Sequence, residues 1–259
     1  AGLSGIGAGY HLKTACPDRS YAILEGRDAI GGTWDLFRYP GIRSDSDMYT
    51  LGYSFKPWTE AKAIADGPSI IEYLDRIVGK YDLRSDMRMG HKVVSADWDS
   101  AEALWTVVSE NADGTRSRLK GRFLFLGAGY YDYDDPYDAA FPGRDKFKGQ
   151  IVHPQFWPGD LDYQGKKVVV IGSGATAVTI VPALAQSGAG HVTMLQRTPT
   201  WMASRPAKDA FANRLRKVLP EKLAYKITRA KNIFLGDLVF KRARSAPEKV
   251  KQFLSGQIK

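Results

Sequence analysis

Apolar and polar positions along the chain predict strands and helices in an order typical of α/β proteins. The apolar run at residues 168–171 is unbroken, which predicts a parallel strand buried on both faces. A glycine-rich turn follows at 172–177, and the pattern then predicts a helix over 178–186 and a strand over 191–195. Near the N-terminus, a glycine-rich turn, an apolar helix start and a strand over 21–24 follow one another in the same way.

The middle and the end of the chain have different patterns. Residues 91–98 and 104–108 predict two strands joined by a short polar connection, and a third strand is expected over 123–126. The last part of the chain predicts helices over 207–219 and 221–244, with a break between them.

The basic charge is concentrated in this last part. The chain carries a net charge of +9, yet residues 205–259 hold 15 Lys and Arg against 4 Asp and Glu, so the first 204 residues have a net charge of −2. No nucleic-acid-binding motif accompanies the charge, and we expect no nucleic-acid partner. We interpret 205–259 as a basic helical insertion that packs on the domain formed by the strands and the helix at 166–204. Peripheral contact with a membrane surface is the alternative.

Composition excludes several other classes of protein. The single cysteine, Cys16, excludes an internal disulfide and a Cys-x-x-Cys redox pair. No apolar stretch approaches the roughly 20 residues of a membrane span, and no signal peptide is recognised. We therefore expect a cytoplasmic protein, and we expect no metal site.

The first glycine-rich turn is typical of one half of a dinucleotide site. Gly2, Ser4 and Gly5 fit a Gly-x-Gly-x-x-Gly motif that lacks its first glycine, and Glu25 follows the next strand, 20 residues after Gly5. The glycines let the backbone approach a pyrophosphate, and Glu25 would accept hydrogen bonds from ribose hydroxyls. A glycine-rich turn before an ordinary helix is the alternative.

The second glycine-rich turn is intact and favours NADPH. It reads Gly172-Ser173-Gly174-Ala175-Thr176-Ala177, and the strand after its helix ends in Gln196 and Arg197. An acidic residue at this place would bind a ribose hydroxyl, whereas the guanidinium of Arg197 suits the additional phosphate of NADPH. A nucleotide-free doubly wound domain with the same turn is the alternative.

Two longer motifs lie around these turns. Gly31-Gly32-x-Trp34 continues through Tyr39-Pro40-Gly41 to Asp45, and Phe147-x-Gly149-x-x-x-His153-x-x-x-Trp157-Pro158 lies between the two nucleotide motifs. Together they resemble the sequence signatures of the Baeyer–Villiger monooxygenases. The resemblance implies an α/β fold with two Rossmann-like domains, one for FAD and one for NADPH, both incomplete in these 259 residues. It divides the chain into an FAD domain at 1–140, a linker at 141–165, the start of the NADPH domain at 166–204 and the insertion at 205–259.

The resemblance also assigns site residues. The residues expected at FAD are Gly2, Ser4, Gly5, Glu25, Gly32, Thr33, Trp34, Asp35, Leu36, Asp45 and, through its backbone, Val93. The residues expected at NADP are Arg43, Ser44, Asp45, Gly172, Ser173, Gly174, Ala175, Thr176, Ala177, Gln196 and Arg197. Asp45 is expected to support a catalytic arginine that this sequence lacks, and His153 to act as a gating residue in the linker.

The activity implied by the resemblance is oxygen insertion next to a ketone carbonyl, and oxidation of sulfides and thioamides, with NADPH, O2 and a C4a-peroxyflavin. The substrate would be a small ketone or sulfur compound. These 259 residues alone are expected to be inactive and to bind FAD poorly. An N- or S-oxygenating flavin monooxygenase is the nearest alternative, although Trp157 favours the Baeyer–Villiger type. A non-catalytic fragment that binds NADPH or a membrane is the alternative from another class.

Overall fold

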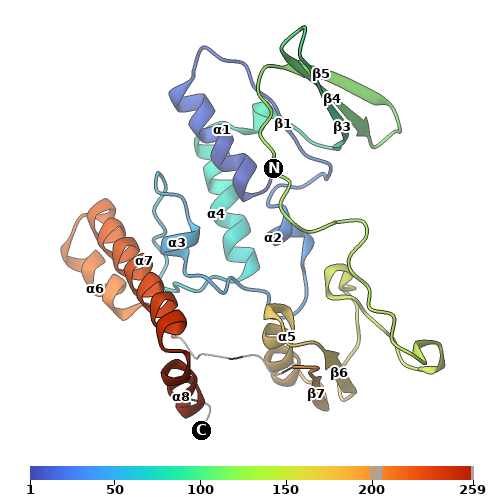
Figure 1. The fold of residues 1–259 in the computed structure, drawn as a ribbon, viewed down its shortest axis with the longest axis vertical. Coiled ribbons are helices and arrows are strands. Elements are labelled where there is room, and N and C mark those ends of the chain that lie inside the picture. Colours follow the sequence, from blue (N-terminus) through green and yellow to red (C-terminus); the bar gives the residue numbers. More distant parts are fainter. Residues whose placement is uncertain (199–200, 202–205, 258–259) are drawn as a thin grey trace. The chain divides into compact units, whose positions relative to one another are not determined.

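The computed structural model describes residues 1–198, 201 and 206–257 (Figure 1). The chain divides into two compact units. The first unit comprises Ala1–Arg38 and Gly67–Gly159, and the second comprises Tyr39–Asp66 and Asp160–Lys259. The chain therefore leaves the first unit after Arg38 and returns to it at Gly67.

The first unit combines helices with short parallel and longer antiparallel strands. Its elements are α1 (Leu3–Ala15), β1 (Ile23–Leu24), α2 (Thr33–Leu36), α4 (Gly67–Lys80), β2 (Met87–Arg88), β3 (His91–Asp99), β4 (Leu104–Asn111) and β5 (Arg116–Gly121), with 3-10 turns at Arg84–Asp86, Arg144–Lys146 and Pro154–Phe156. The strand expected over 21–24 is thus shorter than predicted, and it pairs in parallel with β2.

The core of the first unit lies between α1 and α4. Ile6 of α1 and Ile70, Leu74 and Ile77 of α4 are fully buried, because apolar residues recur along α4 at the spacing of one helix face. β1 packs closely on α1, since a Cβ at Gly9 would lie only 2.8 Å from Ile23 Cδ1. This packing fixes the beginning of α1 relative to the end of β1.

The strands β3, β4 and β5 form an antiparallel sheet in that order. The two strands expected around the polar connection at 100–103 are confirmed as β3 and β4. The prediction of a third strand over 123–126 is wrong, because the third strand is β5 at Arg116–Gly121. β5 pairs with β4 across a turn in which Gly114 has a φ of +79°. Phe123 and Leu126 lie outside any strand and are exposed.

The second unit contains a strand–helix–strand segment and a helical segment. Its elements are α3 (Met48–Leu51), β6 (Lys167–Ile171), α5 (Ala175–Gln186), β7 (His191–Leu195), α6 (Ala210–Val218), α7 (Glu221–Ser245) and α8 (Pro247–Gln257). β6 and β7 are parallel, as predicted. The expectation that β6 is buried on both faces is wrong, because β6 and β7 form a two-stranded sheet among the described residues, and Val169 and Ile171 are exposed.

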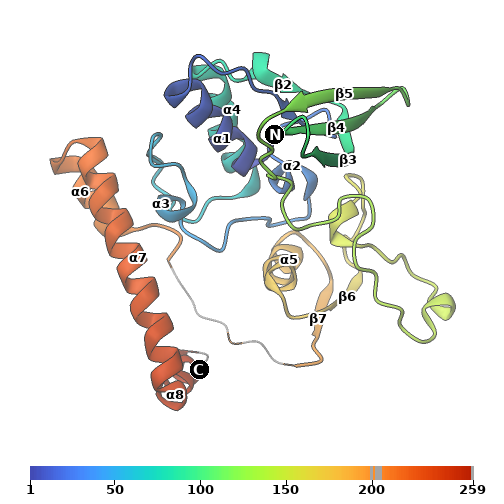
Figure 2. The same ribbon diagram turned by 45° about the horizontal axis from the view of Figure 1, so that its top comes forward.

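The C-terminal helices pack against one another and against the stretch around α3. α6 and α7 lie side by side, and α3 contacts α7 (Figures 1 and 2). The predicted break at Pro220 is confirmed, since Pro220 immediately precedes α7. α8 was not predicted. Within the part of the chain that the structure describes, no helix combines the length and the apolar character that crossing a bilayer requires.

Candidate functional site

The first glycine turn forms the N-terminal end of α1. Gly2 is the residue before the helix, no side chain caps it, and the first turn carries no acidic residue. Ser4 is exposed in this turn, and a Cβ at Gly5 would lie 3.6 Å from Ile23 Cγ2 of β1. No side chain therefore caps this helix end, and the partial positive charge of the helix, which favours an anion, is not neutralised by a neighbouring acid of that turn.

Three glycine segments meet at this end of α1. A Cβ at Gly2 would lie 3.6 Å from Gly32 Cα, and one at Gly127 would lie 3.4 Å from the amide nitrogen of Gly5. Gly32 has a φ of +56°, and a Cβ there would lie 3.2 Å from Gly2 Cα and 3.1 Å from the Tyr133 hydroxyl. Bare backbone beside a helix N-terminus without a side-chain cap is what a pyrophosphate needs. The residues present therefore fit the diphosphate of a dinucleotide such as FAD.

Glu25 lies beside this turn and next to the start of β3, the strand that carries Val93. The carboxylate of Glu25 forms an ion pair with the amino group of Ala1, and the carbonyl of Glu25 accepts a hydrogen bond of 2.7 Å from the His91 amide. This second contact brings the start of β3 beside Glu25. Val93 follows in β3, next to a register shift in its pairing with β4. The structure thus brings together the two residues expected at the adenosine; their binding role stays a prediction.

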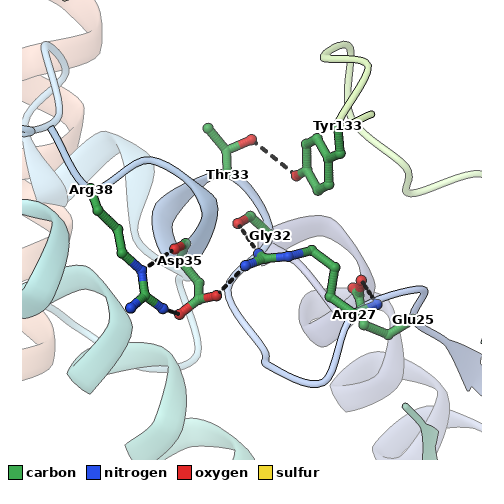
Figure 3. Close-up of polar contacts among 7 residues, drawn as sticks. All are labelled: Glu25, Arg27, Gly32, Thr33, Asp35, Arg38 and Tyr133. Carbon is green, nitrogen blue, oxygen red and sulfur yellow. Dashed lines mark hydrogen bonds and ion pairs between the residues drawn. The ribbon is translucent and has the colours of Figure 1, made fainter. Parts of the chain in front are cut away.

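The motif that begins at Gly31 and Gly32 forms α2, and two arginines hold it in place. Arg27 donates hydrogen bonds from its backbone to Glu25 Oε1 (3.0 Å), from Nη1 to the Gly32 carbonyl (3.2 Å) and from Nη2 to Asp35 Oδ2 (2.6 Å; Figure 3). Arg38 contacts the other oxygen of Asp35 at 3.0 Å. Arg27 therefore links the expected ribose acid to Gly32 and to α2.

The other members of α2 are partly buried. The hydroxyl of Thr33 lies 3.2 Å from that of Tyr133, and Trp34 and Leu36 are half-buried on either side of Asp35. Tyr133 also lies under the Arg27 guanidinium, 6.0 Å from ring centroid to Cζ. The stretch after Gly127 therefore contributes to this site through Tyr133 as well as through its glycine.

Replacing Arg27 by methionine is expected to weaken FAD binding about tenfold, because a charge-assisted contact contributes roughly 1.5–3 kcal/mol. The measurement is the dissociation constant of FAD from the protein expressed from its complete gene. Arg38→Met is the matched control, since Arg38 binds the same carboxylate but its side chain is 70% exposed against 27% for Arg27. Equal losses of affinity in both variants would contradict the special role of Arg27.

The second glycine turn has the same open geometry as the first. Gly174 precedes α5 with no side-chain cap, and the first turn of α5, which contains Ala175, Thr176 and Ala177, has no acidic residue. Gly172 has a φ of +133°, and its amide donates to the Leu195 carbonyl of β7 at 2.9 Å. By contrast, α3 and α6 are each capped by an aspartate. The α5 end therefore also fits a nucleotide phosphate.

Arg197 and Gln196 follow β7 beside this turn. Arg197 is exposed, and within residues 1–198, 201 and 206–257 its guanidinium has no ion pair. Gln196 is half-buried, and the hydroxyl of Ser173 donates to the Thr198 carbonyl at 3.2 Å, which ties the turn to the segment that carries Arg197. An unpaired guanidinium next to an open helix end can receive a phosphate dianion.

The loop at residues 39–45 lies against α5. Gly41 has a φ of +81°, and a Cβ there would lie 2.7 Å from Ala183 Cβ and 3.1 Å from the Thr179 carbonyl. Burial raises the pKa of the Tyr39 phenol, and a hydrogen bond with Thr176 in the first turn of α5 partly opposes that shift. The structure thus places the loop with Arg43, Ser44 and Asp45 in the same unit as the second turn.

Within this loop, Ser44 is buried whereas Arg43 and Asp45 are exposed. The hydroxyl of Ser44 donates to the Ser46 carbonyl at 2.7 Å, so it serves the loop itself. No ion pair of Asp45 is found in the described part of the chain. The aspartate that caps a helix here is Asp47, which the sequence did not single out.

His153 makes a local contact in the first unit. Its Nδ1 accepts a hydrogen bond of 3.2 Å from the Gln155 amide, and it precedes the 3-10 turn at Pro154–Phe156. The side chain of Gln155 is buried and donates to the Asp132 carbonyl at 2.8 Å. The loop that contains the motif from Phe147 to Pro158 is thus tied to the segment that carries Tyr133. The gating role of His153 stays a prediction.

Several residues of the two sites were missed by sequence reasoning. Gly127 could have been found, because Gly-Ala-Gly follows an apolar run there as it does in a nucleotide turn. The repeated tyrosines between 130 and 137 were a weaker signal for Tyr133. No sequence pattern indicated Arg27 or Gln155, because only folding brings them to the groups that they contact. Among the described residues, no group of His, Cys, Asp or Glu could hold a metal ion.

Comparison with known proteins identifies relatives over most of the chain. A sequence model of the flavin-binding monooxygenase-like family matches residues 59–234. The chain is 55% identical over 256 residues to the FAD-containing monooxygenase EthA of Mycobacterium tuberculosis, covering 98% of this chain and 52% of that protein. It is 50% identical over 254 residues to the probable FAD-binding monooxygenase AlmA of Acinetobacter baylyi, covering 98% and 51%. The chain thus spans about half the length of these curated relatives.

Solved structures give the same result for the fold. An oxidized steroid monooxygenase bound to NADP matches with a TM-score of 0.71 and 32% identity, over 87% of this chain and 42% of that one. Cyclohexanone monooxygenase with bound ε-caprolactone, in its Loose conformation, matches with a TM-score of 0.73 and 28% identity, over 87% and 43%. The predicted α/β fold class is confirmed by these matches.

Proposed function

Because the chain belongs to the flavin-binding monooxygenase-like family, we propose that the whole protein is a Baeyer–Villiger type flavin monooxygenase that uses FAD, NADPH and O2. It inserts an oxygen atom next to a ketone carbonyl to form an ester or lactone, and it oxidises sulfides and thioamides. Its substrate is a small ketone or sulfur compound. The enzyme class is supported by relatives that are FAD-containing monooxygenases and by a neighbour bound to NADP.

The observation that carries this proposal is the presence, in one chain, of two helix N-termini that follow glycine turns and have no side-chain cap. The α1 end is followed by Glu25, which suits the ribose of FAD, and the α5 end by Arg197, which suits the phosphate of NADPH. A single-nucleotide dehydrogenase needs one such end. Two such ends, one followed by an acid and the other by an arginine, fit an enzyme that moves reducing equivalents from one dinucleotide to another.

A flavin held here would, when reduced by NADPH, supply the chemistry that activates O2 for transfer of one oxygen atom to the substrate. The residues of this chain bind and orient the two dinucleotides. The amides of α1 and the glycines Gly2 and Gly32 would hold the diphosphate of FAD, with Arg27 fixing Gly32 beside α2. The amides of α5 and Arg197 would hold NADPH.

Asp45 is proposed to orient an arginine on the substrate side, where a fixed cation favours developing negative charge. The side chain of Asp45 is exposed, so its carboxylate is accessible to such an arginine. His153 is proposed to gate the linker, and its local hydrogen bond to the Gln155 amide would hold the imidazole in one orientation.

We further propose a cytoplasmic location, with peripheral membrane contact as the less favoured alternative. Exposed apolar side chains occur at consecutive positions of α7, such as Ile233, Phe234 and Leu235, and so point in different directions around the helix. A membrane-surface helix requires one apolar face and one charged face. The arrangement in α7 therefore argues for burial by protein.

Product analysis tests the proposal. The protein expressed from its complete gene is given NADPH and a cyclic ketone, a sulfide or a tertiary amine, and we expect lactone and sulfoxide. An N-oxide without any lactone would favour the N- or S-oxygenating alternative. A flavin-free protein that yields no product and binds anionic vesicles in a salt-sensitive manner would favour the non-catalytic one.

A further inference from the structure

A single helical turn follows the loop that carries Arg43, Ser44 and Asp45. This turn, α3, has four residues, which is too short to be stable by itself. Its N-terminus is capped by Asp47, whose Oδ1 accepts hydrogen bonds of 3.1 Å from the amides of Tyr49 and Thr50. Met48 and Tyr49 are buried. The position of the turn therefore depends on what packs against it.

α7 contacts both ends of this turn. At the N-terminal end, Asn232 Nδ2 donates to Asp47 Oδ1 at 2.9 Å. At the C-terminal end, Arg229 Nη1 lies 2.6 Å from the Tyr49 carbonyl, 3.0 Å from that of Thr50 and 3.3 Å from that of Gly52. A cation at the C-terminal end of a helix satisfies carbonyls that have no partner within the helix.

Arg229 and Asn232 can do this together because they are three residues apart and face the same side of α7. The Tyr225 hydroxyl, one turn earlier, donates to the Gly52 carbonyl at 3.3 Å. Ala224, Tyr225 and Thr228 are buried along this face. α7 is anchored in turn by an ion pair of 2.8 Å between Lys231 and Asp209, the cap of α6.

The loop before α3 is also held through its backbone, by the stretch at residues 63–65. The Met48 amide donates to the Ala63 carbonyl, and the Ser44 amide donates to the Ala65 carbonyl, both at 2.8 Å. Asp45 lies between these two fixed points. Its side chain and that of Arg43 are exposed, while the backbone on either side is held.

We propose that α7 positions the loop at residues 39–47, and that Arg229 and Asn232 are its positioning residues. They act through α3, so neither touches a cofactor. The inference rests on the proposed function and on the expectation, taken from the sequence resemblance, that Arg43, Ser44 and Asp45 contact NADP. It extends the role of the basic helical segment from packing to the control of nucleotide affinity.

The test compares Arg229→Met with Arg242→Met in the protein expressed from its complete gene. Both substitutions remove one arginine from α7, but Arg242 lies 13 residues further along the helix, outside the region that contacts α3. Two quantities are measured: hydrogen exchange of a peptide covering residues 39–47, and the dissociation constant of NADP+. FAD content and exchange in α5 serve as controls for general unfolding.

We expect Arg229→Met to speed exchange in residues 39–47 and to weaken NADP+ binding about tenfold, with FAD content and exchange in α5 unchanged. Arg242→Met should match the wild type. Unchanged exchange in 39–47, or unchanged NADP+ affinity, would overturn the inference. So would equal acceleration throughout the second unit, because that pattern indicates a merely structural role.

If Arg229→Met does not fold, Asn232→Ala decides the question, since it removes one hydrogen bond to Asp47 and leaves the guanidinium in place. It should give the same pattern of exchange at a smaller amplitude, and no change in 39–47 would overturn the inference. A wild-type protein that binds FAD but no NADP+ would refute the proposed function, and with it the assigned role of the loop. Wild-type NADP+ binding with an unaffected Arg229→Met variant would refute the inference alone.

Discussion

Replacing Gly32 by valine is expected to lower the FAD affinity of the protein at least about 100-fold, equivalent to roughly 3 kcal/mol. Gly32 has a φ of +56°, which a β-branched residue does not adopt without strain. Its Cβ would also lie 3.2 Å from Gly2 Cα, at the point where the glycine turn and α2 meet. Backbone on both sides of the diphosphate site would have to shift.

The measurement is the ratio of flavin to protein after purification, followed by titration with FAD. Gly79→Ala is the matched control, because a Cβ at Gly79 meets nothing within 4 Å and the residue lies in α4. That control should keep its FAD and gain about 0.5–1 kcal/mol of stability. Normal NADP+ binding by Gly32→Val would show that the second site remains folded. A Gly32→Val protein with stoichiometric FAD would contradict the assignment of the first site.

Replacing Arg197 by alanine is expected to raise the KM for NADPH about 10- to 100-fold and to leave the KM for NADH unchanged. The guanidinium of Arg197 is exposed beside the open end of α5, where the additional phosphate of NADPH is expected. NADH lacks that phosphate and cannot lose the contact. Removing the arginine should therefore reduce discrimination between the two dinucleotides and leave the site otherwise intact.

Steady-state kinetics with each dinucleotide measures this effect. Arg214→Ala is the control, since Arg214 is also exposed in the second unit but lies in α6. It should change neither KM. Equal increases for NADPH and NADH in Arg197→Ala would show that Arg197 contributes to the site in general and does not read the phosphate.

Local pattern was sufficient for the elements around the second site. The unbroken apolar run, the glycine turn and the following helix specify β6, α5 and β7 because each depends on neighbours in sequence. Burial of β6 could not be predicted in the same way. It depends on which strands and helices cover each face, and here Val169 and Ile171 remain exposed.

The third antiparallel strand shows the limit of apolarity as a signal. β5 reads Arg-Ser-Arg-Leu-Lys-Gly, so it has one apolar residue, whereas residues 123–126 are entirely apolar. The strand forms because the turn containing Gly114 brings its backbone opposite β4. Pairing across a turn outweighs β propensity when one face is open to solvent.

The candidate sites were predictable where a motif is continuous. Gly2, Glu25 and Gly32 come together as expected because glycine turns and strand ends have fixed geometry. The supporting contacts were not predictable. Arg229 binds carbonyls about 180 positions earlier in the chain, and no local pattern indicates such a pair.

The most direct test of the central claim is isotope labelling of the product. The protein expressed from its complete gene is purified with its flavin and supplied with NADPH, a cyclic ketone and isotopically labelled O2, and the product is analysed by mass spectrometry. A flavin monooxygenase of the Baeyer–Villiger type predicts a lactone that carries one labelled oxygen, formed in step with NADPH oxidation. NADPH oxidation by the flavin-loaded protein with no labelled lactone would contradict the account.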